Sequence, residues 1–151
     1  MNQKLPTKEE IKDFQLKIRK DPVFFVEEVL KNPMSDVQKG ILEAVRDNSE
    51  VAIKSCHASG KSYVAGRIVH WYLNAYKDSI VITTAPTFRQ VKEVLWREIK
   101  SAVVGKNIYP PDAILDTKID ISERWFALGL STNKPDSFQG FLAPHLMVLI
   151  D

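Results

Sequence analysis

Residues 51–76 read VAIKSCHASGKSYVAGRIVHWYLNAY. The β-branched run at 51–55 predicts a short buried strand, and the small residues after it predict a loop. The stretch 63–76 has the length and the apolar spacing of a helix. Strand, loop and helix in this order form the first unit of an α/β fold.

The same pattern recurs directly downstream. Residues 79–86 (SIVITTAP) predict a second buried strand, and Thr87 with Gln90 predicts a capping box that opens another helix. Two successive strand–helix units indicate parallel strands.

The rest of the sheet is expected from three later segments. Residues 113–121 and 124–132 flank Ser122 and Glu123, which predicts an antiparallel hairpin, and 146–151 (LMVLID) predicts a last apolar strand. The expected architecture is α/β, with helices on both faces of a mostly parallel sheet.

Helices are expected before this sheet. Thr7 and Glu10 have capping-box spacing and open a helix that should stop before Pro22, and a second helix fits 23–31. A third helix is expected to begin near Ser35. The chain therefore divides into a helical N-terminal segment, 1–34, and an α/β domain, 35–151.

Composition narrows the class of protein. The chain has 151 residues with 44% apolar content, which suits one domain. Its formal charge of +2 does not indicate a strongly basic nucleic-acid-binding domain, and its single cysteine excludes an internal disulfide. The sequence shows no secretory signal and no apolar run long enough to span a membrane, so we expect a cytoplasmic protein.

The loop between the first predicted strand and helix has the chemistry of a phosphate site. Phosphate groups are bound by converging backbone N–H groups, a helix N-terminus and a flexible cation. The pattern is close to G-x-x-x-x-G-K-[ST], with Ser55 in place of the first glycine. We expect ATP to be held by Ser55, Cys56, His57, Ala58, Ser59, Gly60, Lys61 and Ser62. A turn rich in serine and glycine is the structural alternative.

A magnesium site is expected beside this loop. The Ser62 hydroxyl is placed to ligate Mg²⁺, and Asp151 ends an apolar strand. The carboxyl ends of parallel strands meet at one edge of a sheet, so the Asp151 carboxylate should lie near the loop. The alternative for Asp151 is an exposed aspartate with no metal.

Several stretches together resemble the ATPase domain of the large terminase subunit, the DNA-packaging motor of tailed bacteriophages. They are PMSDVQKGIL (33–42), VAIKSCHASGKS (51–62), VITTAPTFRQVKEVLWREI (81–99), STNKPDSFQGFLAPH (131–145) and LMVLID (146–151). The resemblance implies a P-loop NTPase fold of the ASCE type, a three-layer sandwich whose sheet is incomplete in 35–151. The family's later strands, its catalytic glutamate and its nuclease domain would follow Asp151.

The resemblance also implies roles and partners. Lys61 looks like the catalytic lysine, Gln38 like the glutamine that recognises adenine, and His57 occupies the place of the family's loop arginine. The implied ligands are ATP and Mg²⁺. The implied partners are double-stranded viral DNA, a portal protein and a small terminase subunit in a ring-shaped oligomer within the bacterial host. Two alternatives stay open: a superfamily 1 or 2 helicase ATPase fragment, and a noncatalytic nucleotide-binding or assembly module.

Overall fold

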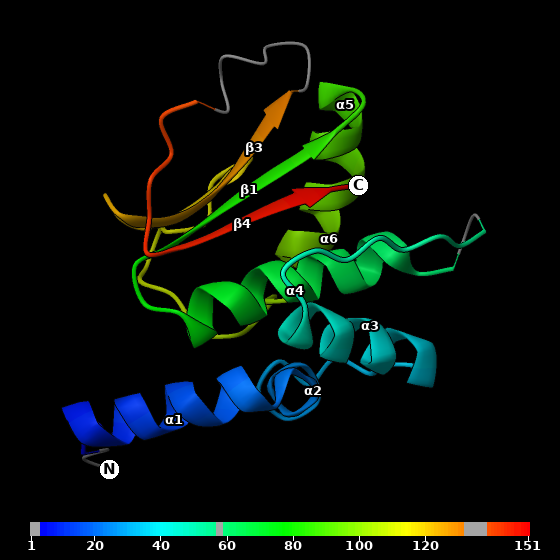
Figure 1. Ribbon diagram of the computed structural model, residues 1–151. Coiled ribbons are helices and arrows are strands. Elements are labelled where there is room, and N and C mark those ends of the chain that lie inside the picture. Colours follow the sequence, from blue (N-terminus) through cyan, green and yellow to red (C-terminus); the bar gives the residue numbers. More distant parts are fainter. Residues whose placement is uncertain (1–3, 57–58, 132–138) are drawn as a thin grey trace.

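The computed structural model describes residues 4–56, 59–131 and 139–151. Figure 1 shows a sheet with helices packed beside it. The helical elements are α1 (Lys8–Lys20), α2 (Pro22–Phe24), η1 (Phe25–Val29), α3 (Asp36–Asp47), α4 (Lys61–Ala75), α5 (Phe88–Gln90), η2 (Val91–Leu95) and α6 (Trp96–Ser101). The strands are β1 (Ser79–Ala85), β2 (Lys118–Ser122), β3 (Trp125–Ser131) and β4 (His145–Ile150).

The sheet is open and mixed, with the strand order β2-β3-β1-β4. Strand β1 is parallel to both β3 and β4, while β2 and β3 form an antiparallel hairpin. The expected α/β class, the mostly parallel sheet and the hairpin are therefore confirmed. Strands β2 and β4 are the two edges of this sheet.

The strand expected at 51–55 is absent from the sheet. Residues 49–55 belong to no helix or strand, and they make no backbone–backbone hydrogen bond with any other described residue. Val51 and Ile53 are 39% and 40% exposed. The prediction was wrong because a β-branched run becomes a strand only where a neighbouring strand pairs with it.

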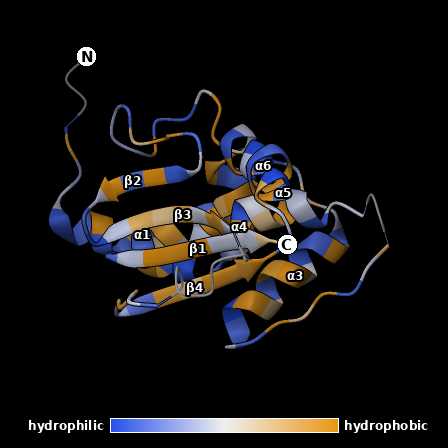
Figure 2. Cartoon of the chain, turned by 90° about the horizontal axis from the view of Figure 1, so that it is seen from above, coloured by the Kyte–Doolittle hydropathy of each residue, from blue (hydrophilic) through white to orange (hydrophobic). Residues whose placement is uncertain are grey.

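The described helices cover one face of the sheet, not both as expected. On that face Val81 of β1 and Ala127 of β3 join one hydrophobic cluster with Val69 of α4 and Ile99 of α6. Figure 2 shows the strands lying over the helices when the chain is viewed from above. The opposite side of β4 stays open, with Leu146, Val148 and Ile150 exposed by 42%, 52% and 74%.

Helix α4 is the centre of the fold because it is buried on almost every side. The indole N–H of Trp71 donates to the Ile18 carbonyl of α1 at 2.7 Å, and that of Trp125 in β3 donates to the Leu73 carbonyl at 2.9 Å. The helix therefore joins the N-terminal helices to the sheet. Trp71 and Trp96 are fully buried and act as packing residues.

The N-terminal helices follow their sequence signals. Thr7 and Glu10 form the expected capping box of α1, which ends at Lys20, just before Pro22. Ile18 and Leu42 belong to the same hydrophobic cluster as Trp71, so the segment before 35 packs on the α/β part through a shared core. None of the described helices has both the length and the apolar character needed to cross a membrane.

Candidate phosphate-binding site

The loop before α4 ends at a helix N-terminus that is open to a ligand. Gly60 caps this helix with φ +80°, a left-handed conformation, and no side chain of the described residues caps the end. The first intrahelical hydrogen bond runs from the Val64 amide to the Gly60 carbonyl at 3.1 Å. The amides of Lys61, Ser62 and Tyr63 therefore precede the hydrogen-bonded ladder, where the positive end of the helix dipole favours an anion.

The loop is closed by its own side chains. The Lys61 ammonium donates to the Ser55 carbonyl at 3.2 Å, and the Ser55 and Ser59 hydroxyl groups lie 2.6 Å apart. These contacts join the two ends of the loop and hold the lysine side chain over it. A cation over a loop of small residues at a helix N-terminus is an arrangement that binds phosphate oxygens.

The two expected magnesium ligands lie together. The Ser62 hydroxyl donates to Oδ2 of Asp151 at 3.0 Å, although the two residues are 89 positions apart in sequence. Asp151 reaches this place because β4 runs parallel to β1, and its amide donates to the Thr84 carbonyl at 2.9 Å. A hydroxyl and a carboxylate oxygen are hard ligands of the kind that Mg²⁺ takes.

Gln38 lies beside the loop, but its amide is occupied within the chain. Its Oε1 accepts from the Ser35 amide at 2.9 Å, and its Nε2 is 3.5 Å from the Gly60 carbonyl that accepts from it. Ser35 and Gln38 thus form the capping box of α3. The S-x-x-Q spacing could have revealed this contact, which links α3 to the loop and leaves the adenine role of Gln38 a prediction.

Some candidate residues lie elsewhere. His57 and Ala58 are outside the described residues, and Cys56 is exposed. Within the described ranges, no group of three or more His, Cys, Asp and Glu side chains is arranged to hold a metal ion. Any metal at Ser62 and Asp151 would therefore need further oxygen ligands from phosphate or water.

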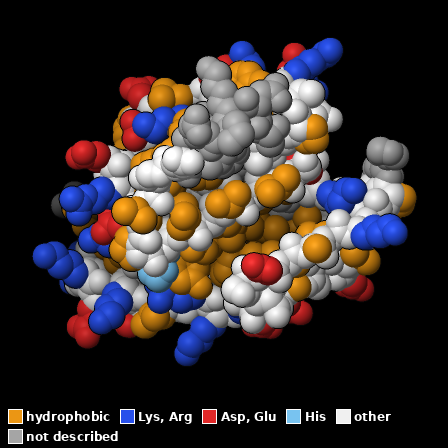
Figure 3. All heavy atoms as spheres, turned by 45° about the horizontal axis from the view of Figure 1, so that its top comes forward, with side chains coloured by type: hydrophobic (Ala, Val, Ile, Leu, Met, Phe, Trp, Pro, Cys, Tyr) orange, Lys and Arg blue, Asp and Glu red, His pale blue; other side chains and the backbone are white. Residues whose placement is uncertain are grey.

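A groove of about 900 Å³, lined by both polar and apolar side chains, extends away from this site. It lies between β4 and residues 49–53, over α4, and Lys61 and Asp151 line it where it meets the loop. Figure 3 shows hydrophobic side chains gathered around a hollow on this side of the molecule. The groove therefore borders the phosphate loop without being the phosphate site itself.

Three hydrogen bonds that the sequence does not reveal hold α4 in place behind the loop. The guanidinium of Arg67, 4% exposed, donates to Oε2 of Glu98 at 2.9 Å and to Oδ1 of Asn32 at 2.8 Å. The Tyr63 hydroxyl donates to the Pro33 carbonyl at 2.8 Å. The first turns of α4 are thereby tied to residues 32–33 and to α6.

No family model matches this chain, and no curated protein matches its sequence significantly. The function is therefore inferred from the geometry of the site and from the resemblance of its motifs.

Proposed function

We propose that this chain binds ATP with Mg²⁺ at the loop 55–62. The observation that carries this proposal is the hydrogen bond between Ser62 and Asp151, 3.0 Å long, at the N-terminus of the helix that Lys61 begins. Two distant sequence signals, a G-K-S tripeptide and an aspartate after an apolar strand, meet at one point of the fold. A chance G-K-S turn would not require such a carboxylate.

Each residue has a defined task in this proposal. The backbone N–H groups of Lys61–Tyr63 donate hydrogen bonds to phosphate oxygens, and the Lys61 ammonium turns from the Ser55 carbonyl to a phosphate oxygen. Ser62 and Asp151 hold the metal ion, which neutralises phosphate charge. The backbone can approach a phosphate closely because Gly60 has no side chain.

The wider role is proposed from the resemblance of the motifs. We propose that the site belongs to the ATPase of a DNA-packaging motor, which has a P-loop NTPase fold, an ASCE-like sandwich. In such a motor ATP hydrolysis drives double-stranded DNA into a viral prohead. The chain would then work in the bacterial cytoplasm beside a portal protein and a small subunit. The buried strand β1, leading into the Thr87 cap of α5, supports a translocase-like core.

Titration calorimetry with Mg–ATP tests the proposal. We expect saturable binding with one site per chain, and Lys61→Ala should weaken it at least tenfold. Lys77→Ala is the matched control, because Lys77 is an exposed lysine just beyond the other end of α4. Wild-type chain that does not bind Mg–ATP, or equal loss in both variants, would reject a phosphate loop.

Measurement of ATP turnover distinguishes the motor from the helicase fragment and from the noncatalytic module. Release of phosphate that DNA stimulates supports the motor, whereas binding with no turnover favours a noncatalytic nucleotide-binding module. A helicase fragment predicts stimulation by single-stranded DNA in preference to duplex.

A further inference from the structure

The side chain of Gln38 is in direct contact with the backbone of the phosphate loop. Its Nε2 donates to the Gly60 carbonyl at 3.5 Å, from a helix that lies 22 positions earlier in the chain. A Cβ built on Gly60 would stand 2.5 Å from the same nitrogen, so any side chain at position 60 would displace the carboxamide. The glycine of the loop and the glutamine of α3 are therefore fitted to each other.

A second contact sets the orientation of this carboxamide. Its Oε1 accepts from the Ser35 backbone N–H at 2.9 Å, and the Ser35 hydroxyl accepts from the Gln38 backbone N–H at 3.3 Å. Since the oxygen of the carboxamide faces a donor, its NH₂ group is turned away from that donor and needs an acceptor. The capping box of α3 thus directs the NH₂ group at Gly60.

The carbonyl that accepts this contact belongs to the first peptide of the phosphate-binding end of α4. The Val64 amide also donates to it at 3.1 Å, and a carbonyl oxygen has a lone pair for each donor. The same planar peptide carries the Lys61 N–H on its opposite side. Gln38 therefore fixes the direction of the first N–H group that we propose to bind phosphate.

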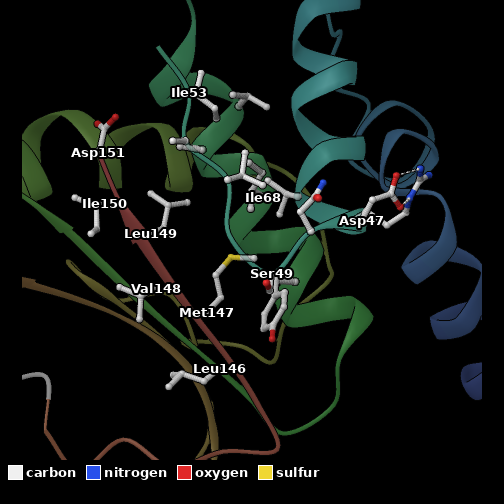
Figure 4. Close-up of a pocket in the computed structure, with 18 of the residues that line it drawn as sticks. Asp47, Ser49, Ile53, Ile68, Leu146, Met147, Val148, Leu149, Ile150 and Asp151 are labelled. Atoms are coloured by element: carbon white, nitrogen blue, oxygen red, sulfur yellow. Dashed lines mark hydrogen bonds and ion pairs between the residues drawn. The ribbon is translucent and has the colours of Figure 1, made fainter. Parts of the chain in front are cut away.

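The start of α4 is held by two separate elements. Figure 4 shows Asp151 at the end of β4, and its carboxylate accepts from the Ser62 hydroxyl at 3.0 Å. Gln38 of α3 contacts Gly60, two residues before Ser62. Asp151 has a carboxylate oxygen to offer a metal ion, whereas Gln38 reaches the site through the loop backbone.

The residues before α3 are also anchored to α4, so Gln38 projects from a fixed base. The Tyr63 hydroxyl donates to the Pro33 carbonyl at 2.8 Å, and the Arg67 guanidinium donates to Oδ1 of Asn32 at 2.8 Å. Movement of Gln38 away from the loop would strain both contacts.

We propose that Gln38 is a positioning residue for the triphosphate, which holds the Gly60–Lys61 peptide in its phosphate-binding orientation and does not contact adenine. This inference rests on the proposed ATP site. It departs from the role that the motif resemblance implies, because both ends of the carboxamide are engaged within the chain. The effect of Gln38 is then independent of the base, since ATP, GTP and inorganic tripolyphosphate share the same three phosphates.

Calorimetry of wild type and Gln38→Ala with magnesium and each of these three probes tests the proposal. We expect all three affinities to fall by the same factor, about three- to tenfold, which is the range for one lost hydrogen bond. A loss that is greater for ATP than for tripolyphosphate would assign the carboxamide to adenine and overturn the proposal. Unchanged affinity for all three probes would also overturn it.

Gln90→Ala is the matched control, because Gln90 occupies the same position in another capping box. Its Oε1 accepts from the Thr87 backbone N–H at 3.1 Å, and its side chain is exposed. Both variants lose a capping contact and should lower the free energy of unfolding to a similar extent, yet only Gln38→Ala should weaken binding of the probes. Equal weakening in the two variants would indicate a general loss of stability and overturn the proposal.

Hydrogen exchange without nucleotide tests the contact between Gln38 and the loop. Gln38→Ala should speed exchange of the Val64 amide, which shares the Gly60 carbonyl with Gln38, while the Tyr76 amide at the far end of α4 should exchange as in wild type. Gln38→Glu should act in the same way, because a carboxylate accepts from the Ser35 N–H but cannot donate to Gly60. Unchanged exchange at Val64 in both variants would overturn the proposal.

The wild-type chain separates failure of this inference from failure of the ATP site. If wild type binds none of the three probes, the ATP site and the role of Gln38 are both rejected. If wild type binds them and Gln38→Ala weakens ATP alone, the ATP site stands and the positioning role is rejected.

Discussion

The Ser62 hydroxyl donates to the Asp151 carboxylate at 3.0 Å, and this contact joins the start of α4 to the carboxyl end of β4. It converts two separate sequence signals into one candidate metal site. Hydroxyl and carboxylate oxygen atoms at the edge of a parallel sheet are suited to Mg²⁺ rather than to a softer metal.

Removal of the Asp151 charge should affect ATP binding only when Mg²⁺ is present. We expect Asp151→Asn to lower the affinity for Mg–ATP by roughly tenfold, because a ligand or orienting partner of the metal is lost. In EDTA the affinity for free ATP should stay within about twofold of wild type, since Lys61 and the helix N-terminus remain. Calorimetry in both buffers measures the difference, and an equal loss in each would contradict a metal role.

Substitution of Gly60 should damage the loop for two reasons that can be separated. A Cβ at Gly60 would lie 2.5 Å from Nε2 of Gln38, and its φ of +80° costs a residue with a side chain about 1–2 kcal/mol. We expect Gly60→Ala to lower both the free energy of unfolding and the affinity for ATP.

Two glycines provide controls for this experiment. Gly105 has φ +71° with nothing within 4 Å, so Gly105→Ala reports the backbone strain alone. Gly40 lies inside α3 with open space around it, and Gly40→Ala should stabilise the chain by about 0.5–1 kcal/mol. If urea unfolding gives Gly60→Ala and Gly105→Ala the same loss, the contact with Gln38 is not restrictive.

Local sequence signals predicted much of the fold. Thr7 and Thr87 each cap the helix that their spacing indicates, α3 begins beside Ser35 as expected, and alternating or continuous apolar runs identify β1, β3 and β4. These features depend on residues within a few positions of one another, so the sequence contains the information directly. The meeting of Ser62 with Asp151 also followed, because parallel strands end at one edge of the sheet.

Other features depend on partners far along the chain. Val51 and Ile53 have strand propensity, but a strand also needs a neighbouring strand to pair with. A groove lies where that neighbouring strand would be. Gln38 has the chemistry to recognise adenine, yet its amide caps α3 and contacts Gly60. Arg67 is buried inside α4 because Glu98 and Asn32 happen to meet it, and no spacing within α4 indicates this.

Arg67 should be one of the polar residues on which stability depends most. Its guanidinium bonds to Glu98, Asn32 and the Tyr63 carbonyl in a largely buried place. Hydrogen bonds to a charged group contribute about 1.5–3 kcal/mol, so Arg67→Met should lower the free energy of unfolding by at least that amount. Arg67→Lys should recover only part of it, because an ammonium cannot reproduce the planar fork.

Arg89→Met is the matched control for Arg67→Met. Arg89 forms an ion pair with Glu93 at 2.8 Å, but its side chain is 83% exposed. Exposed pairs of this kind contribute little, so the midpoint of urea unfolding should not move measurably. Equal shifts in the two variants would contradict a special role for the buried guanidinium.

His70 should make the stability of the chain depend on pH. The imidazole is fully buried, with Nε2 2.6 Å from the Ile99 carbonyl and Nδ1 2.6 Å from the Tyr109 hydroxyl. A carbonyl only accepts, so Nε2 carries the proton and the neutral ring accepts from Tyr109 at Nδ1. Burial lowers the pKa of His70 from 6.5 to about 4, because a charged ring would lose its hydration there.

The two pKa values of His70, 6.5 in the unfolded chain and about 4 in the folded chain, decide how the stability changes with pH. Between pH 6.5 and about 4 the unfolded chain binds a proton at His70 and the folded chain does not. The free energy of unfolding therefore has its full value above pH 6.5 and falls as the pH drops, by up to about 3 kcal/mol from this residue. Urea unfolding at several pH values measures the fall.

His70→Gln isolates the contribution of the imidazole from that of the carboxylates. An amide can still donate and accept at this place but does not titrate. We expect the variant to be less stable at pH 7 and to lose less stability than wild type between pH 6.5 and 4. Parallel curves for the two proteins, or an NMR titration of His70 with a midpoint near 6.5, would show that the folded chain leaves this ring free to take up a proton.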